Sequence, residues 1–257
     1  MKLLLDLGNT RLKWALATQA DMVAVGAIAN EDLGPDDIGQ YFSANLSTTL
    51  LEQTLSEVWV SSVGAAEVLK PILSWLHDET GLEANRVDVS NPVRGFQNHY
   101  ESIDSLGVDR WVAALGARSL VPQGDLIIID AGTAVTIDWL SQDNVFEGGV
   151  ILPGAKLMHQ SLLGGTVGID AESSDVVQII GKTTSECVNS GIGFGMGGAV
   201  ERIVKEMTET IDRPTRLILT GGGANLIAEF TNLGAESEPD LVLHGLLYLS
   251  LINSPTP

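Results

Sequence analysis

The order of apolar and polar residues at the start of the chain predicts a β-hairpin. Residues 3–5 are three leucines, and the Asp-Leu-Gly-Asn sequence that follows is typical of a buried strand entering a turn. Residues 11–16 then alternate between two faces, with Leu12, Trp14 and Leu16 on the apolar one. Because successive side chains of a strand point to opposite sides, this alternation predicts a half-buried strand that pairs with the first.

Strand and helix patterns alternate through the rest of the first half. The spacing of Val108, Val112 and Leu115 places them on one helix face, although Gly116 weakens that helix. A polar loop containing proline and glycine occupies residues 91–104. The expected strands are 22–29, 58–63 and 86–89, and the expected helices run from after Pro35 towards Leu55, over 65–77 and over 105–120.

The opening pattern recurs in the second half of the chain. Residues 121–124, Val-Pro-Gln-Gly, are typical of a domain boundary, and after them an apolar run again leads into Asp-x-Gly and an alternating strand. Asp6 and Gly8 align with Asp130 and Gly132 at a spacing of 124 residues. We therefore expect an α/β protein built from two duplicated domains. The expected domains are residues 1–121 and 122–257, and the second contains strands at 126–129, 145–151 and 217–220 and helices from about 154 and at 184–211, 224–230 and 240–252.

The charge of the chain excludes several kinds of partner. The 257 residues include 14 lysines and arginines against 33 aspartates and glutamates, a net charge of −19. Such a surface repels phosphate backbones and anionic lipids, so we expect neither nucleic acid nor a membrane as a partner. There is no apolar run of about 18 residues, the N-terminus turns acidic at Asp6, and Cys187 is the one cysteine. These features predict a cytoplasmic protein without internal disulfides.

The two Asp-x-Gly turns are candidate phosphate sites. Glycine lets backbone N–H groups approach a phosphate, a threonine hydroxyl adds a donor, and the carboxylate can hold a cation or its water. Either turn alone is explained as well by an ordinary β-turn. Two copies of the turn, each at the start of a half-chain, favour a site in which both turns bind one polyphosphate from opposite sides. Lys13 could add a positive charge to this site. The glycines within 220–225 could let the backbone lie against a flat ligand, or they could simply form a turn between a strand and a helix.

A third candidate lies near the start of the helix expected over 105–120. The Asp109 carboxylate could accept a proton from a substrate hydroxyl that attacks phosphorus, and Arg110 could bind a substrate carboxylate with paired N–H donors. On these residues alone a simpler interpretation is favoured, in which Asp109 stabilises the helix N-terminus and Arg110 is its local partner. The four histidines show no ligand spacing, which argues against a histidine-bound metal.

Together, these motifs resemble those of a known family. The sequence DLGNTRLK at 6–13 is similar to the first phosphate motif of type III pantothenate kinases, and GVDR at 107–110 is similar to their substrate motif. DAGTAVTID at 130–138 is similar to their second phosphate motif, and GGVILPG at 148–154 and TGGGA at 220–224 also fit. The combination is specific and spans nearly the whole chain. The wider superfamily contains acetate and sugar kinases, heat-shock ATPases and actin.

The resemblance implies two ribonuclease H-like (actin-like ATPase) domains with a cleft between them. It implies ATP-dependent phosphorylation of pantothenate, the first step of coenzyme A synthesis, with Asp109 as proton acceptor and Mg²⁺ on the ATP. It also implies a potassium or ammonium ion at Asp130, and a homodimer with the substrate site near its interface. The implied ATP-binding residues are Asp6, Leu7, Gly8, Asn9, Thr10, Arg11, Leu12, Lys13 and Thr133. The implied pantothenate-binding residues are Tyr100, Gly107, Val108, Asp109, Arg110 and Thr184, with Thr183 as the alternative to Thr184.

Three other functions fit parts of the pattern. One is a kinase of the same superfamily that acts on another small alcohol or carboxylate. Another is a non-catalytic regulator, since some relatives are described as accessory factors for transcription. The two turns, Lys13 and Asp109 argue against lost catalysis, and the charge of −19 argues against direct DNA contact. The third is a chaperone-like or actin-like ATPase, for which 257 residues leave little room for a further domain.

Overall fold

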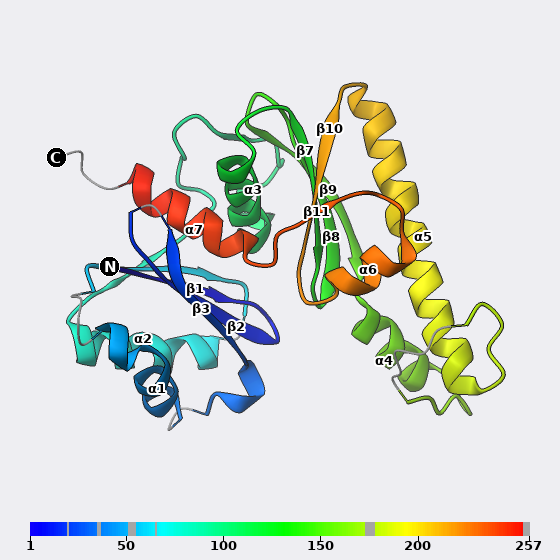
Figure 1. The fold of residues 1–257 in the computed structure, drawn as a ribbon, viewed down its shortest axis with the longest axis horizontal. Helices are drawn as coiled ribbons and strands as arrows, with labels where there is room; N and C mark the ends of the chain where they lie inside the picture. Colours follow the sequence, from blue (N-terminus) through cyan, green and yellow to red (C-terminus); the bar gives the residue numbers. More distant parts are fainter. Residues whose placement is uncertain (20, 35–36, 51–54, 65, 173–177, 254–257) are drawn as a thin grey trace. The chain divides into compact units, whose positions relative to one another are not determined.

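The chain folds into two compact units. The computed structural model describes residues 1–19, 21–34, 37–50, 55–64, 66–172 and 178–253 (Figure 1). The first unit comprises Met1–Val121 together with the segment that begins at Leu241, and the second comprises Pro122–Asp240. The expected division after Val121 coincides with this change of unit. The assignment of residues 241–257 to the second domain differs from the structure, in which the last helix packs in the first unit.

The sheet of the first unit begins with the expected hairpin. β1 (Lys2–Leu7) pairs antiparallel with β2 (Arg11–Ala17), which pairs antiparallel with β3 (Met22–Ala29). On the other side of β1 lie the parallel strands β4 (Glu57–Ser62) and β5 (Ala84–Arg86), so the order is β3-β2-β1-β4-β5. The other elements of this unit are η1 (Asn30–Asp32), α1 (Ile38–Leu50), α2 (Ala66–Thr80), β6 (Gln97–Asn98), η2 (Ile103–Ser105), α3 (Val108–Leu120) and α7 (Leu241–Ile252).

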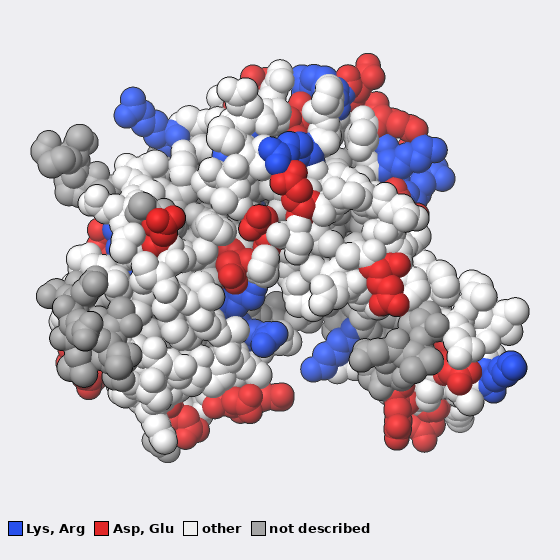
Figure 2. Space-filling view, viewed as in Figure 1, with Lys and Arg blue, Asp and Glu red and all other residues white. Residues whose placement is uncertain are grey.

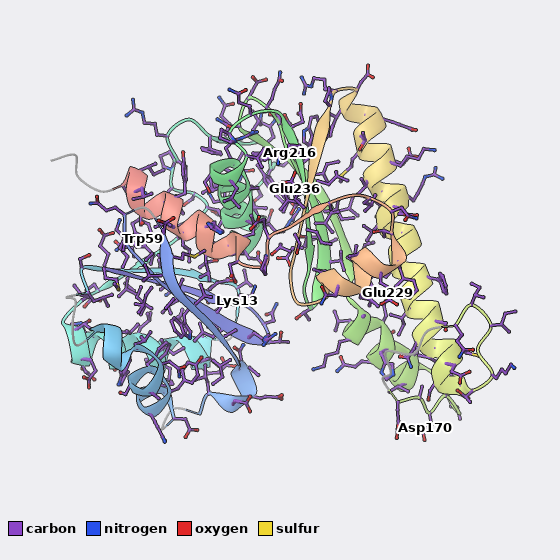
Figure 3. All side chains as sticks on the ribbon, viewed as in Figure 1. Lys13, Trp59, Asp170, Arg216, Glu229 and Glu236 are labelled. Carbon is purple, nitrogen blue, oxygen red and sulfur yellow. The ribbon has the colours of Figure 1, made fainter. Side chains whose placement is uncertain are left out.

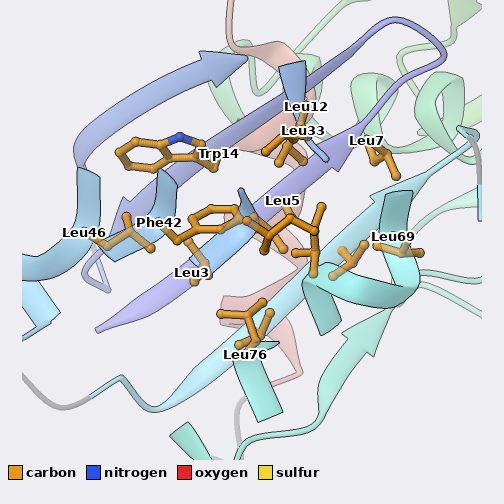
Figure 4. Packing of buried hydrophobic residues seen from close by; sticks show 14 of the residues in the cluster. Leu3, Leu5, Leu7, Leu12, Trp14, Leu33, Phe42, Leu46, Leu69 and Leu76 are labelled. Carbon is orange, nitrogen blue, oxygen red and sulfur yellow. The ribbon is translucent and has the colours of Figure 1, made fainter. Parts of the chain in front are cut away.

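Side-chain alternation along the strands gives this sheet two different faces. Leu3, Leu5 and Leu7 of β1 point to one face, where they form a core with Phe42 of α1 and with side chains of α2 (Figure 4). The even-numbered residues of β1, which include Asp6, point to the opposite face, on which α7 packs. The turn after β1 is therefore attached to a strand that is buried on both sides.

Helices α3 and α7 approach each other closely because glycines lie at their contact. A Cβ atom at Gly116 of α3 would overlap the carbonyl oxygen of Leu241. Likewise, a Cβ atom at Gly245 of α7 would overlap the carbonyl oxygen of Val112 on α3. Packing thus explains why Gly116 lies inside a helix that it weakens, since only glycine lets the two helix backbones lie this close together.

The second unit repeats the strand order of the first. β7 (Asp125–Ala131) pairs antiparallel with β8 (Ala134–Leu140), and β8 pairs antiparallel with β9 (Val145–Pro153). β10 (Thr215–Thr220) and then β11 (Glu236–Ser237) run parallel on the other side of β7. Five of the six strands of this sheet follow the order β9-β8-β7-β10-β11, which matches β3-β2-β1-β4-β5 strand for strand and confirms the predicted duplication. The helices of this unit are α4 (Ala155–Gly165), α5 (Thr184–Ile211) and α6 (Ala224–Phe230).

Helix α5 covers the sheet of the second unit. Ile127 and Ile129 of β7 share a core with Met196, Val200 and Val204, which recur along one face of α5. The predicted bounds of α5 and α6 agree with the structure, because long amphipathic patterns are the clearest signals that a sequence carries.

A buried carboxylate anchors the start of β7. Asp125 is 1% exposed, and its Oδ1 accepts hydrogen bonds of 3.0 Å from Trp139 Nε1 and from Arg213 Nη2. Its Oδ2 lies 3.0 Å from Arg213 Nε. This bidentate contact with the Arg213 guanidinium compensates for the loss of hydration of the carboxylate. Asp125 therefore has a structural role.

Acidic side chains are spread over both units on the face drawn in Figure 2, as the sequence composition indicates. Within the described part of the chain, no helix combines the length and the apolar character that crossing a membrane requires.

Several predicted boundaries are wrong by a few residues. The strand expected at 86–89 is β5, because the chain leaves the sheet after the Val87 N–H bonds to the carbonyl oxygen of Val60. The loop expected at 91–104 contains β6 and η2, and β11 has no predicted counterpart. The helix expected from residue 105 begins at Val108, because Gly107 is extended (φ −60°, ψ 128°). Pro35, residues 51–54 and Ala65, which the predicted helices adjoin or include, lie outside the described residues.

Candidate active site

The first phosphate motif forms the turn between β1 and β2. The last residue pair of this hairpin is Leu7 with Leu12, so four residues lie between the two paired positions. The Gly8 N–H closes the turn with a hydrogen bond of 3.0 Å to the carbonyl oxygen of Arg11. Leu7 and Leu12 are fully buried in the core, so a ligand could meet only their backbones, whereas the two residues at the tip of the turn are exposed.

Three polar side chains lie in a row across the sheet beside this turn. The strand registers place Lys13 of β2 and Ser61 of β4 opposite Asp6 of β1, so all three point to the same face (Lys13 is labelled in Figure 3). Asp6 and Lys13 are half-buried, whereas Ser61 is fully buried and its hydroxyl has no hydrogen-bond partner among the described residues. Sequence reasoning missed Ser61, because a serine inside an apolar strand carries no motif of its own.

The second Asp-x-Gly turn connects β7 to β8 and is one residue shorter. The last residue pair of that hairpin is Ala131 with Val135, which leaves three residues between the paired positions instead of four. The Gly132 N–H again closes the turn, with a hydrogen bond of 2.9 Å to the carbonyl oxygen two residues later. The shorter connection explains why Thr133 comes one place earlier in its motif than Thr10 does.

The glycine run after β10 packs against this second turn. Gly221 has a φ of +89°, and a Cβ atom there would overlap the Asp130 carboxylate. The Gly223 N–H donates a hydrogen bond of 2.8 Å to the carbonyl oxygen of Ala131. Close packing thus accounts for Gly221, whereas a Cβ atom at Gly222 would meet nothing within 4 Å.

Asp130 has oxygen donors around it. Its half-buried carboxylate and the carbonyl oxygen of Ala131 both lie against the Cα of Gly221. Oxygen donors of this kind suit hard cations. The described residues contain no group of three or more His, Cys, Asp or Glu side chains that could hold a metal ion. A cation at Asp130 would therefore need backbone carbonyls and water in addition to this carboxylate.

The first turn of α3 carries a carboxylate with altered acidity. Asp109 is half-buried, and its Oδ1 accepts a hydrogen bond of 2.8 Å from the backbone N–H of Arg110. A Cβ atom at Gly107 would lie 2.6 Å from that same oxygen, so glycine leaves room for the carboxylate. Burial raises the pKa of Asp109 above its ordinary value of 3.8, although the N–H and the charge of Arg110 act in the opposite direction. A raised pKa makes this carboxylate a stronger base.

Arg110 is a buried cation with a fixed orientation. Its side chain is held by Tyr100, whose hydroxyl oxygen accepts a hydrogen bond of 2.7 Å from Nη1. The guanidinium carbon also lies 5.5 Å from the centre of the Tyr100 ring, within the range of a cation–π contact. Arg110 is 7% exposed, and its contacts with Tyr100 show that it is more than a local partner of Asp109.

Thr184 begins α5 and borders a cavity. The preceding residue, Thr183, caps the helix, because its Oγ1 accepts a hydrogen bond of 3.2 Å from the Glu186 N–H. Thr184 is exposed and lines a largely apolar cavity of about 620 Å³ between α4 and α5, which Cys187 also lines. With Thr183 used as the cap, Thr184 is the better placed of the two to contact a ligand.

The residues predicted from the sequence fall into two groups, one in each unit. The first unit contains 6–13, Tyr100 and 107–110, and the second contains Asp130 with Thr133 and Thr184. Within the first group, hydrogen bonds join Gly8 to Arg11, Arg110 to Tyr100, and the backbone N–H of Arg110 to the Asp109 carboxylate.

Comparison with known proteins identifies relatives across nearly the whole chain. A sequence model of type III pantothenate kinases matches residues 2–206. The chain is 35% identical over 248 residues to a type III pantothenate kinase of Chromobacterium violaceum, which covers 96% of this chain and 98% of the relative. A solved structure from Campylobacter jejuni, assigned to a Baf family of transcriptional activators, has a TM-score of 0.55 at 18% identity and covers 96% of both chains. A ROK family glucokinase from Streptomyces griseus has a TM-score of 0.50 at 12% identity and covers 96% of this chain and 98% of that chain.

At such low identity the two solved structures show the fold alone, that of the actin-like ATPases and sugar kinases, as expected from the duplicated α/β units. The match to the family model shows more than the fold, because it spans both Asp-x-Gly turns and the motif at the start of α3. The relative from Chromobacterium violaceum covers 96% of this chain at 35% identity. This chain therefore belongs to the type III pantothenate kinase family.

Proposed function

We propose that this protein transfers the γ-phosphoryl group of ATP to pantothenate, giving 4′-phosphopantothenate in the first step of coenzyme A synthesis. The observation that carries the proposal is the pair at the start of α3. Asp109 is a carboxylate whose pKa is raised, and Arg110 next to it is a buried cation held by Tyr100. Pantothenate has one primary hydroxyl to be deprotonated and one carboxylate to be bound, so it needs a base and a cation.

In the proposed reaction Asp109 accepts the proton of the substrate hydroxyl. The hydroxyl oxygen forms a bond to the γ-phosphorus as the bond from that phosphorus to the β–γ bridging oxygen breaks, and ADP leaves with the electron pair of that bond. Arg110 binds the substrate carboxylate and thereby fixes the distance of the hydroxyl from Asp109. The proposed substrate contacts also include Tyr100, Gly107, Val108 and Thr184.

The proposed ATP-binding residues are those of the two turns, 6–13 and Thr133. Glycine at position 8 lets phosphate oxygens approach backbone N–H groups, and the hydroxyls of Thr10 and Thr133 are further donors. Lys13 supplies a positive charge, and Asp6 can accept hydrogen bonds from water on the metal ion that accompanies ATP. Mg²⁺, when bound, neutralises charge on the phosphates.

A potassium or ammonium ion at Asp130 is a further part of the proposal. The donor set fits such an ion, since a half-buried carboxylate and a backbone carbonyl oxygen lie side by side against Gly221. The ion would offset the negative charge of Asp130 close to the Thr133 turn, where an anionic phosphate is proposed to bind. We also propose that the protein is cytoplasmic and that it forms a homodimer. Light scattering of the purified protein can test the dimer.

The decisive experiment is phosphorylation of pantothenate by the purified protein with Mg²⁺ and ATP, in potassium, ammonium and sodium salts separately. Mass spectrometry should detect 4′-phosphopantothenate, with ADP formed in equal amount, in potassium or ammonium but not in sodium. Equal rates in all three salts would refute the cation at Asp130 and leave the kinase intact. Folded protein that binds ATP but forms no product in any salt would refute pantothenate as the substrate. A panel of other small hydroxy acids would then identify a different acceptor, and its failure would favour a non-catalytic regulator.

A further inference from the structure

The first phosphate turn is held by a residue that lies outside its motif. Asn30 follows β3 directly, and its backbone N–H donates a hydrogen bond of 2.9 Å to the carbonyl oxygen of Thr10. Its side-chain Nδ2 donates a second hydrogen bond, of 3.0 Å, to the carbonyl oxygen of Gly8. One residue thus binds two peptide groups of the turn between β1 and β2.

The opposite side of the same turn is restrained by the residues after β4. The N–H groups of Val63 and Gly64 both donate to the carbonyl oxygen of Leu7, at 3.1 Å. A Cβ atom at position 64 would overlap the carbonyl oxygen of Gly8. That oxygen is therefore confined between the Asn30 amide and the Cα of Gly64.

Confinement of the Gly8 carbonyl has a consequence for the next N–H group. In a trans peptide the C=O and the following N–H point in opposite directions, because the peptide unit is planar. Since the Gly8 carbonyl points to Asn30, the Asn9 N–H must point away from it, at the exposed tip of the turn. A backbone N–H fixed in this direction is a donor suited to an anion.

The second unit provides an internal comparison. There the Gly154 N–H, which follows β9, donates a hydrogen bond of 3.0 Å to the carbonyl oxygen of Thr133, as Asn30 does for Thr10. Gly154 has no side chain, so the side-chain hydrogen bond of Asn30 has no equivalent there. The backbone contact is thus a shared part of the fold, whereas the amide is specific to the longer first turn.

The energetics of Asn30 also favour a role beyond folding. Its Oδ1 is buried and has no hydrogen-bond partner among the described residues. Burying an unpaired amide oxygen costs stability, so a side chain selected for stability alone would not be expected here. We propose that Asn30 is a positioning residue for ATP, which orients the Gly8–Asn9 peptide towards a bound phosphate. This inference rests on the proposed assignment of ATP phosphates to residues 6–13.

Asn30→Asp tests the inference with almost no change of shape. It replaces the donor amide by a carboxylate that repels the Gly8 carbonyl oxygen. The matched control is Asn45→Asp, because the exposed Asn45 makes the same kind of bond, from Nδ2 to the carbonyl oxygen of Tyr41 at 2.8 Å, within α1 of the same unit. Asn30→Ala is the second variant, which removes the donor without adding repulsion. Calorimetric titration with a non-hydrolysable ATP analogue and steady-state kinetics are measured on all four proteins.

We expect Asn30→Asp to raise the Kd of the analogue and the KM of ATP at least tenfold, and Asn30→Ala to raise them about fivefold. The KM of pantothenate should stay within twofold in both, and Asn45→Asp should match the wild type. ATP affinity within twofold of wild type in both Asn30 variants would overturn the inference, as would an equal loss in Asn45→Asp. A wild-type protein that fails to bind the analogue would overturn the ATP assignment itself. Analogue binding without phosphorylation of pantothenate would overturn only the proposed substrate.

Discussion

Replacement of Asp109 by asparagine separates the chemistry of this residue from its structural role. The amide oxygen of asparagine can still accept the 2.8 Å hydrogen bond from the Arg110 N–H, so the first turn of α3 should keep its conformation. The amide cannot take up a proton from the substrate. General base catalysis contributes about 10²–10⁴-fold to a rate. At about 1.4 kcal/mol per tenfold change, Asp109→Asn should raise the activation barrier by about 3–5 kcal/mol.

The raised pKa of Asp109 adds a second, independent readout. Because burial disfavours the carboxylate, the group becomes protonated at a higher pH than an exposed aspartate does, so kcat/KM should fall on the acid side with a midpoint above 3.8. The sign for stability follows from the same shift. The folded state binds the Asp109 proton more tightly than the unfolded state does. The contribution of Asp109 to the free energy of unfolding therefore falls as the pH rises from 3.8 through the pKa of the folded state.

The assay is steady-state phosphorylation of pantothenate between pH 4.5 and pH 8, with urea denaturation of each variant as a check on folding. Asp104→Asn is the matched control, since Asp104 is an exposed carboxylate in η2, five residues away. Binding of ATP should be unchanged in both variants. A kcat for Asp109→Asn above a tenth of the wild-type value would refute the assignment of Asp109 as the base.

Three further changes test contacts described above. Tyr100→Phe removes the hydroxyl that binds Arg110 but keeps the ring, so the KM of pantothenate should rise about five- to tenfold with little change in kcat, as steady-state kinetics can measure. Gly245→Ala forces α3 and α7 apart and should lower the free energy of unfolding by about 1–3 kcal/mol in urea denaturation, so a neutral result would contradict the packing. Asp125→Asn weakens the contact with Arg213 and should cost about 2–3 kcal/mol in the same assay, and an unchanged midpoint would mean that the ion pair contributes nothing.

The duplication was predictable because it leaves a short signature in the sequence. Aspartate and glycine recur at a spacing of 124 residues, and the structure aligns them at the ends of β1 and β7, each at the same place in its sheet. Even the earlier position of Thr133 follows from a turn that is one residue shorter. The two-residue strands β6 and β11 were not predictable, since they contain too few residues for any alternation to be visible.

Residues that reach the candidate site through long-range contacts could not be predicted from the sequence. Asn30 and Ser61 lie outside the recognisable motifs, and only the pairing of distant strands brings them to the first turn. The burial that shifts the pKa of Asp109 also depends on packing that no local pattern reports. The hydrogen bond that identifies Thr183 as a helix cap was likewise not visible in the sequence.

The place of α7 affects the order in which the chain can fold as it is synthesised. The second unit is one continuous segment that ends at Asp240, so all of its residues leave the ribosome before α7 does. The first unit begins the chain, yet the sheet face that carries Asp6 and the apolar side of α3 stay uncovered until α7 is made. A premature stop shortly before Leu241 would therefore damage the unit that holds residues 6–13 and Asp109, although the lesion lies far from these residues along the chain.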